Sequence, residues 1–174
     1  VVNIYPAAEY TAVNPWAESS LTRLQALLAS PATPLTNDNL STVPFNGAAA
    51  QQYAAQAKFI PFNGGNGVSM ISQYSQFPGP ILKDNSFYHY EGLTSDGKYF
   101  VAALFPVYLP LQSTAENPNA DSLPNPHPSD ITDTAALTAY YQGITDTLTA
   151  ASPDSFQPSL TLVDSLIQSI TVSP

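Results

Sequence analysis

The chain has 174 residues, of which 44% are apolar and 10% are charged. This length fits a single domain of about 100–200 residues, and the apolar share is sufficient for a buried core. The charged share is far below the roughly 25% of an average soluble domain, which excludes a coiled coil and a solvating acidic tail. The net charge is −9 with four basic residues, so the composition argues against a nucleic-acid groove and a polybasic membrane surface.

Cysteine is absent from the chain. This removes disulfides, thiolate nucleophiles and zinc–cysteine sites from consideration. The sequence also lacks any run of about 18 apolar residues, so no membrane-spanning helix is predicted. It is rich in Ser, Thr, Asn, Gln, Ala and Pro, and poor in Lys and Glu, which favours an exported bacterial protein that is extracellular or at the cell surface. We expect one domain over residues 1–174 and no cofactor.

The predicted elements begin with a strand-like run at Val1–Tyr5, followed by a helix. Asn14 suits the N-cap of this helix and Pro15 its first turn, while Ser30-Pro31 ends it. One apolar stripe follows the helical period, formed by Ala17, Leu21, Leu24 and Leu28. A second, weaker helix is predicted from Gly47 to Ala57, with Ala50, Tyr53, Ala54 and Ala57 on its buried side.

The hydrophobic period then changes from that of a helix to that of a strand. Two hairpins are predicted, from the strands Lys58–Phe62 and Val68–Tyr74, and Phe87–Leu93 and Lys98–Tyr108. Glycine-rich residues 63–67 suit the first turn because glycine adopts positive φ without strain. Asp96-Gly97 between apolar runs is a strong signal for the second turn.

The second turn fixes a register in which Leu93 pairs with Phe100. Side chains alternate between the two faces of a strand. One face therefore carries Phe87, His89, Glu91 and Leu93 with Phe100, Ala102 and Leu104, and the other carries Tyr88 and Tyr90 with Val101, Ala103 and Phe105. Both sets are rich in apolar groups, so we expect the sheet to be covered on both sides.

Residues 110–131 are rich in proline and show no period, which predicts a long irregular loop. Two helical stripes close the chain, Leu137, Tyr141, Ile144 and Leu148, and then Leu160, Val163, Ile167 and Ile170. The order of elements predicts an α+β fold. Its mostly antiparallel sheet is built from the two central hairpins and flanked by N- and C-terminal helices.

Three segments resemble an uncharacterised group of exported bacterial domains that often occur on lipoproteins of filamentous bacteria. They are Gln73–Ile81, Phe87–Tyr99 and Ser155–Ile170, and the resemblance covers roughly residues 45–172. It implies export and allows a lipid anchor on a cysteine upstream of Val1. It implies no catalytic residue.

His89 and Glu91 are the candidate catalytic pair, because residues two apart on a strand share a face. Together they would suit general acid–base chemistry in a hydrolase. The simpler interpretation is a hydrogen-bonded structural pair, since the sequence around them supplies no nucleophile for a triad.

Glu116, Asn119 and Asp121 are the weak metal candidates, with Asn117 between them. Hard cations such as Ca²⁺ prefer oxygen ligands. Pro118 interrupts the EF-hand pattern, and no glycine or terminal glutamate follows at the required spacing. We therefore interpret the segment as a solvated loop and predict no metal.

Aromatic residues are concentrated in the central region, and four of them are candidates for a binding surface beside Pro78–Pro80: Tyr74, Phe77, Tyr88 and Tyr90. Tyrosine combines an apolar ring with a polar tip, which suits interfaces. The alternative is that these rings pack the sheet against helices.

The combined pattern favours a non-enzymatic exported or cell-surface domain that binds a protein partner or a surface polysaccharide. A variant of this interpretation is a subunit of an extracellular assembly, which allows self-assembly. Two alternatives remain open: a peptidase inhibitor that presents loop 110–131, and a hydrolase that uses His89 and Glu91. Burial of His89 away from any cleft would argue against the hydrolase.

Overall fold

The computed structural model describes residues 1–31, 34–40, 49–112, 114 and 126–172. Its centre is a five-stranded antiparallel sheet with the strand order β1-β7-β6-β4-β3. The strands are β1 Val2–Pro6, β3 Ala55–Phe62, β4 Gly65–Ser72, β6 Phe87–Thr94 and β7 Tyr99–Pro106. A two-stranded sheet pairs β2 (Ala50–Gln51) with β5 (Tyr74–Ser75).

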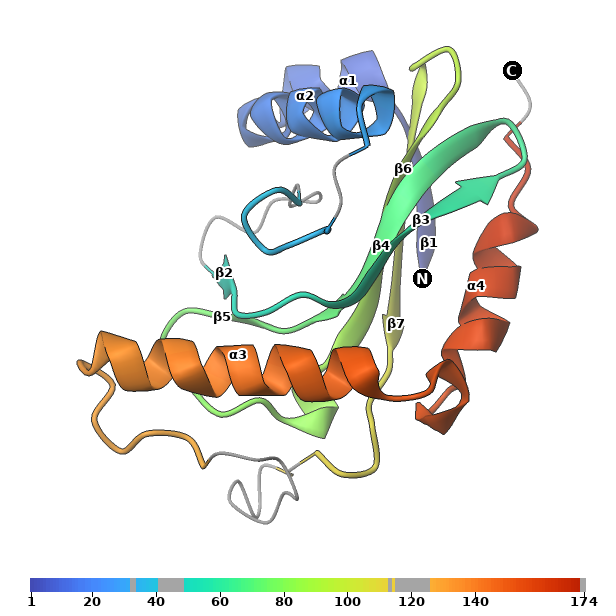
Figure 1. Ribbon diagram of the computed structural model, residues 1–174. Coiled ribbons are helices and arrows are strands. Elements are labelled where there is room, and N and C mark those ends of the chain that lie inside the picture. The colour runs from blue at the N-terminus through green and yellow to red at the C-terminus, as the bar shows by residue number, and fades with distance from the viewer. Residues whose placement is uncertain (32–33, 41–48, 113, 115–125, 173–174) are drawn as a thin grey trace.

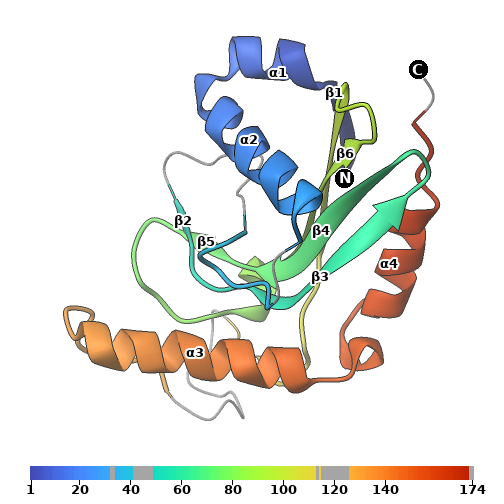
Figure 2. The ribbon, with the colours of Figure 1, turned by 45° about the horizontal axis from the view of Figure 1, so that its top comes forward.

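Helices from both ends of the chain cover the two faces of the sheet (Figure 1). The N-terminal pair is α1 (Ala7–Val13) and α2 (Pro15–Ala29), and the C-terminal pair is α3 (Thr134–Ala150) and α4 (Leu160–Gln168). Short 3₁₀ turns occupy Lys83–Asn85 and Pro153–Ser155. Figure 2 shows α2 and α4 on opposite sides of the strands. The predicted α+β fold is therefore confirmed.

The register of the β6–β7 hairpin decides which side chains reach which helices. Leu93 lies opposite Phe100, as predicted. The face that carries Tyr88 and Tyr90 packs against α3 and α4, and we call it the α4 face. The face that carries Phe100 and Leu93 packs against α2, and we call it the α2 face. The prediction that both sides of the sheet are covered is confirmed.

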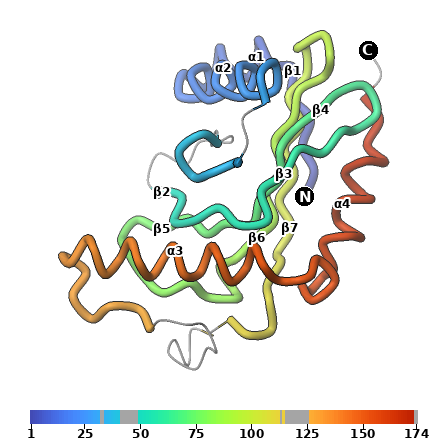
Figure 3. Tube along the Cα trace, in the orientation of Figure 1, coloured from blue at the N-terminus to red at the C-terminus, as the bar shows by residue number. Residues whose placement is uncertain are grey.

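Each face has its own apolar core, and Figure 3 traces the helices that close them. On the α4 face, Ile144, Leu148, Leu160, Val163 and Ile167 supply the helical side of the core. On the α2 face, Leu21, Leu24 and Leu27 do so. Full burial of one such side chain contributes about 1.5–3 kcal/mol. All three stripes predicted from the helical period therefore stabilise the fold, with Leu28, Tyr141 and Ile170 only partly buried.

A ring stack joins the N-terminal elements to the α2 face. The ring centroid of Tyr10 lies 4.8 Å from that of Tyr5 and 5.7 Å from that of Phe100. Tyr5 belongs to β1 and Tyr10 to α1. The predicted strand at the N-terminus is thus an edge strand of the sheet, and α1, which the sequence did not predict, folds back over it.

The predicted helix from Gly47 to Ala57 is wrong in its described part. Ala50 and Gln51 form β2, which pairs with Tyr74 and Ser75, and β3 begins at Ala55. Alanine favours helices only by a few tenths of a kcal/mol per residue, and tertiary pairing overrides so weak a preference. Residues 47 and 48 lie outside the described part of the chain.

The first hairpin turn is tighter than predicted. Phe62 pairs with Gly65, so only Asn63 and Gly64 form the loop, in place of residues 63–67. Gly64 has a φ of 98°, which explains the glycine at that position. The C-terminal segment closes beside this turn, where the backbone N–H of Asn63 donates to the carbonyl oxygen of Ile170 at 2.9 Å.

Within the predicted loop 110–131, the described residues carry no helix or strand. The remaining residues, 113 and 115–125, lie outside the described part of the chain. Across the residues that the structure does describe, no helix has both the length and the apolar character needed to cross a membrane.

The Asp96-Gly97 turn gives a direct test of the hairpin geometry. Gly97 has a φ of 70°, and an added Cβ would meet no atom closer than 4.0 Å. Gly97→Ala should therefore destabilise the protein by about 1 kcal/mol through backbone strain alone. Urea unfolding measures this cost. Gly79→Ala is the matched control, because an added Cβ there would make only ordinary contact with the Phe77 carbonyl oxygen at 3.8 Å and Gly79 has no positive φ. Equal losses in both variants would contradict the assignment.

Asp96 gives the same turn a dependence on pH. Its carboxylate accepts hydrogen bonds from Thr94 Oγ1 at 2.7 Å and from the Lys98 backbone N–H at 3.1 Å. These bonds, the Thr94 bond first, lower the pKa of Asp96 to about 2. The unfolded chain therefore binds more protons than the folded chain between about pH 4 and pH 2. The free energy of unfolding decreases as the pH is lowered through that window. The melting temperature of Asp96→Asn should fall less over this window than that of the parent chain, and identical pH profiles would contradict the assignment.

Candidate binding groove

His89 and Glu91, the candidate catalytic pair, share the α2 face as predicted, but both are 0% exposed. His89 lies opposite Met70 in the sheet, and its ring centroid is 6.3 Å from that of Tyr74. Neither residue lines the groove of about 870 Å³ described below or the smaller hollows of about 220–290 Å³. Both side chains are thus buried in the α2 face, and none of these hollows in the described part of the chain reaches them.

The structure buries Tyr88 and Tyr90, so the prediction that they belong to a binding surface is wrong. Both point from β6 into the core of the α4 face. The hydroxyl of Tyr90 donates to the carbonyl oxygen of Ile60 at 3.1 Å, and that of Tyr88 donates to Asp164 Oδ1 at 3.0 Å. Desolvation raises the pKa of both phenols. The alternative, that these rings pack the sheet against helices, holds for them.

Tyr74 and Phe77, the other two surface candidates, are placed differently. Tyr74 is half-buried, and its hydroxyl donates to Gln51 Oε1 at 3.2 Å across the small sheet. Phe77 is 71% exposed. The segment after Phe77 is held to α3, because the Tyr141 hydroxyl accepts from the Gly79 N–H at 2.9 Å and donates to the Gly79 carbonyl at 3.0 Å. Of the four candidates, Phe77 is the one whose side chain is mostly exposed.

The metal candidates Glu116, Asn119 and Asp121 lie outside the described residues. Within the described part of the chain, no three His, Cys, Asp or Glu side chains come together as an ion would require.

A groove of about 870 Å³ lies on the α2 side of β3. In Figure 1, segment 34–40 lies above β3 and helix α3 lies below it. The floor and one end are apolar, formed by Pro34, Leu35, Ala54, Ala57, Phe59 and Ala150. The rim is polar, formed by Thr36, Asn37, Asp38, Gln142, Thr145, Asp146 and Thr149.

The upper wall of the groove, residues 34–40, is held in place by the side chains of Asn39 and Arg23. Asn39 Oδ1 accepts from the Thr36 N–H at 2.8 Å, and Asn39 Nδ2 donates to the Pro34 carbonyl at 3.0 Å. Arg23 of α2 donates to the carbonyl oxygens of Asp38 and Leu40 at 3.1 and 2.8 Å. The wall is thus organised before any ligand arrives, which lowers the entropic cost of binding.

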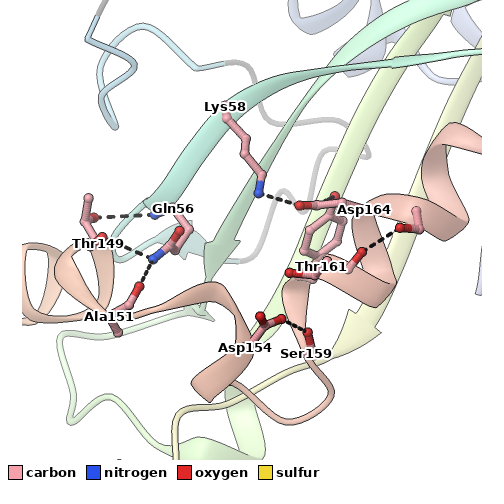
Figure 4. A network of polar contacts seen from close by, with 10 residues as sticks. Gln56, Lys58, Thr149, Ala151, Asp154, Ser159, Thr161 and Asp164 are labelled. Carbon is pink, nitrogen blue, oxygen red and sulfur yellow. Dashed lines mark hydrogen bonds and ion pairs between the residues drawn. The ribbon is translucent and has the colours of Figure 1, made fainter.

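The lower wall, formed by α3, is held to β3 by the side chain of Gln56 (Figure 4). Its side-chain amide donates to the carbonyl oxygens of Leu148, Thr149 and Ala151 at 2.9, 3.1 and 2.8 Å. Carbonyls in the last turn of a helix have no partner within the helix, so one amide caps the end of α3. Gln56 reaches them from a bulge in β3, where its φ is 54°.

A second anchor holds α4 against the other side of β3. The Lys58 ammonium forms an ion pair with Asp164, which also accepts the hydrogen bond from Tyr88 (Figure 4). Lys58 points to the α4 face, away from the groove, because it is one residue from Phe59 on the same strand. Lys58 and Phe59 are consecutive in β3, so the ion pair and the groove lie on opposite faces of the strand.

The groove is acidic and rich in hydrogen-bonding groups. Among the described residues that line it, Asp38 and Asp146 are the charged ones, and none is Lys, Arg or His. Gln142 Nε2 donates to Asp146 Oδ1 at 2.8 Å, and Gln51 Nε2 donates to Asn37 Oδ1 at 2.5 Å. These contacts orient the amides and carboxylates of the rim. The arrangement disfavours anions and offers both acceptors and donors to a polar ligand.

Sequence reasoning did not find this groove, because its residues come from three distant segments. Comparisons of the chain with protein-family models, with curated proteins and with solved structures find no match. The resemblance to exported bacterial domains stays a prediction.

Proposed function

We propose that this protein is a non-enzymatic, exported binding domain that holds a chain of an uncharged surface polysaccharide in its groove. The supporting observation is a groove with fixed walls, an apolar floor and a polar rim of mixed donors and acceptors. Binding sites of this kind are largely formed in advance and are oriented by a small number of polar groups.

The chemistry of the groove matches that of a sugar chain. Phe59, Leu35 and the alanines of the floor give an apolar surface on which the C–H faces of sugar rings can lie. Amide, hydroxyl and carboxylate groups of the rim suit ligand hydroxyls, which both donate and accept hydrogen bonds. The two carboxylates and the net charge of −9 disfavour phosphorylated or sulfated polymers.

The placement of the ionisable groups supports binding without catalysis. His89 and Glu91 are enclosed in the α2 face, away from the groove. Glycoside hydrolysis uses one carboxyl group that is kept protonated by an apolar environment, and both groove residues, Asp38 and Asp146, are exposed. Export is supported by the composition and by the resemblance of residues 45–172 to exported domains.

Titration of the ¹⁵N-labelled protein with short neutral oligosaccharides (cello-, xylo-, manno- and chito-oligomers) tests this proposal. We expect amide chemical-shift changes at residues 34–38, 57–59 and 142–150 with at least one series. Thr145→Tyr places a ring in the groove and should abolish these changes. Thr138→Tyr is the matched control: Thr138 is exposed two turns before Thr145 on the same face of α3, outside the residues that line the groove, and its change should leave the shifts intact.

Three outcomes would overturn the proposal. The first is no response to any neutral oligosaccharide. The second is a response to a lysine-rich peptide alone, which would make the groove a site for basic peptides. The third is release of new reducing ends from a bound oligosaccharide, which would make the protein a hydrolase.

A further inference from the structure

Among the described residues, the main sheet has a free edge at β1, which pairs with β7 on one side and is the last strand of the sheet order. The N-terminal amino group of Val1 donates to the Leu104 carbonyl at 2.7 Å, and the Leu104 N–H donates back to the Val1 carbonyl at 2.9 Å. The Ala7 N–H donates to Lys98 at 2.8 Å. In an antiparallel pair, the residues that bond to a given neighbour alternate along the strand. Odd-numbered residues of β1 therefore bond to β7.

The backbone groups of Val2 and Ile4 consequently point away from the sheet. Their side chains are 38% and 44% exposed. Natural edge strands are usually protected by lysines, by inward charges or by bulges. β1 carries no charged side chain and pairs with β7 without a bulge. Pro6 is the one protective residue, since it lacks an N–H and ends the row of donors.

We propose that β1 pairs with the β1 strand of a second copy of this protein, antiparallel, about a twofold axis at Asn3. In this register Val2 lies opposite Ile4 of the second copy. All outward N–H and C=O groups of both residues then find partners across the axis. Moving the axis to Ile4 would place Val2 opposite Pro6, which has no N–H, so the outward carbonyl of Val2 would be left unpaired. The strand is thus complementary to itself, and the proposal is independent of the groove.

The rest of the sheet favours a closed dimer over a longer assembly. At the opposite edge, Asn63 of the β3–β4 turn forms a parallel bridge with Thr171, and α3 and α4 both contact β3. Pairing through β1 would use the edge that the fold leaves open and produce one continuous sheet of both copies. A twofold contact of this kind closes upon itself.

Charge and area set the strength of this dimer. Each copy carries a net charge of −9, while β1 itself carries no charged side chain. The bodies repel each other, so salt should strengthen pairing by screening that repulsion. One pair of short strands buries less than the roughly 1,200 Å² of a standard interface. We therefore expect a weak dimer whose population rises with protein concentration and with salt.

A single cysteine tests the twofold register. Asn3 and its symmetry mate would form a non-hydrogen-bonded pair with their Cα atoms about 4.5 Å apart, a distance that a disulfide spans. The chain contains no cysteine, so Asn3→Cys introduces a single thiol. Mild oxidation of Asn3→Cys should give mostly covalent dimer. Val13→Cys is the control, an 81% exposed position at the end of α1, and should give little. Equal cross-linking of the two variants, or none in Asn3→Cys, would overturn the register.

Sedimentation of the unmodified chain tests the dimer itself. Ile4→Pro removes an outward N–H and leaves the bonds of Asn3 and Tyr5 to β7 in place, so it should weaken the dimer about tenfold or more without unfolding the sheet. Circular dichroism checks the fold of this variant. If the parent chain stays monomeric at millimolar concentration in both low and high salt, the proposal is wrong, whatever the groove binds.

Discussion

Leu93 lies opposite Phe100 across the Asp96-Gly97 turn, and a slip of one residue would exchange the two faces of the hairpin. In the observed register, Tyr88 and Tyr90 point toward α3 and α4, while Phe100 points toward α2. Two separate apolar cores are therefore built on one pair of strands. The helices at both ends of the chain depend on this hairpin, because each packs on side chains that its register presents.

The same register buries most of the side chains in the centre of the chain that were candidates for a functional site. It buries the two tyrosines in one core and encloses His89 and Glu91 in the other. Groups that could bind a partner are left at the periphery of the sheet. One such place is the groove beside β3, where Gln56 and Arg23 fix the walls. The other is the open edge of β1. Recognition at these two places requires no change in the hairpin that supports the fold.

Local signals in the sequence predicted the elements whose contacts are close in the chain. The Asp96-Gly97 turn predicted the register, and the helical stripes predicted α2, α3 and α4. The alanine-rich stretch before Lys58 was wrongly predicted as a helix, because its helix preference is weaker than strand pairing with β4 and β5. The groove could not be predicted, since it depends on hydrogen bonds between residues far apart in sequence, such as Gln56 to Ala151. Alternation assigned Tyr90 to the correct face, but the pattern alone does not say how completely a helix covers that face.

Native-state hydrogen exchange tests most directly whether one hairpin supports both cores. Leu24→Ala empties part of the α2-face core and Ile167→Ala part of the α4-face core, and each should cost about 2–5 kcal/mol. If the hairpin is shared, the amides of Val101 and Ala103 exchange only through global unfolding. Each variant should then lower their protection by the full amount of its global destabilisation. The account is contradicted if Leu24→Ala speeds exchange in α2 alone and leaves the hairpin and α4 as protected as in the parent chain.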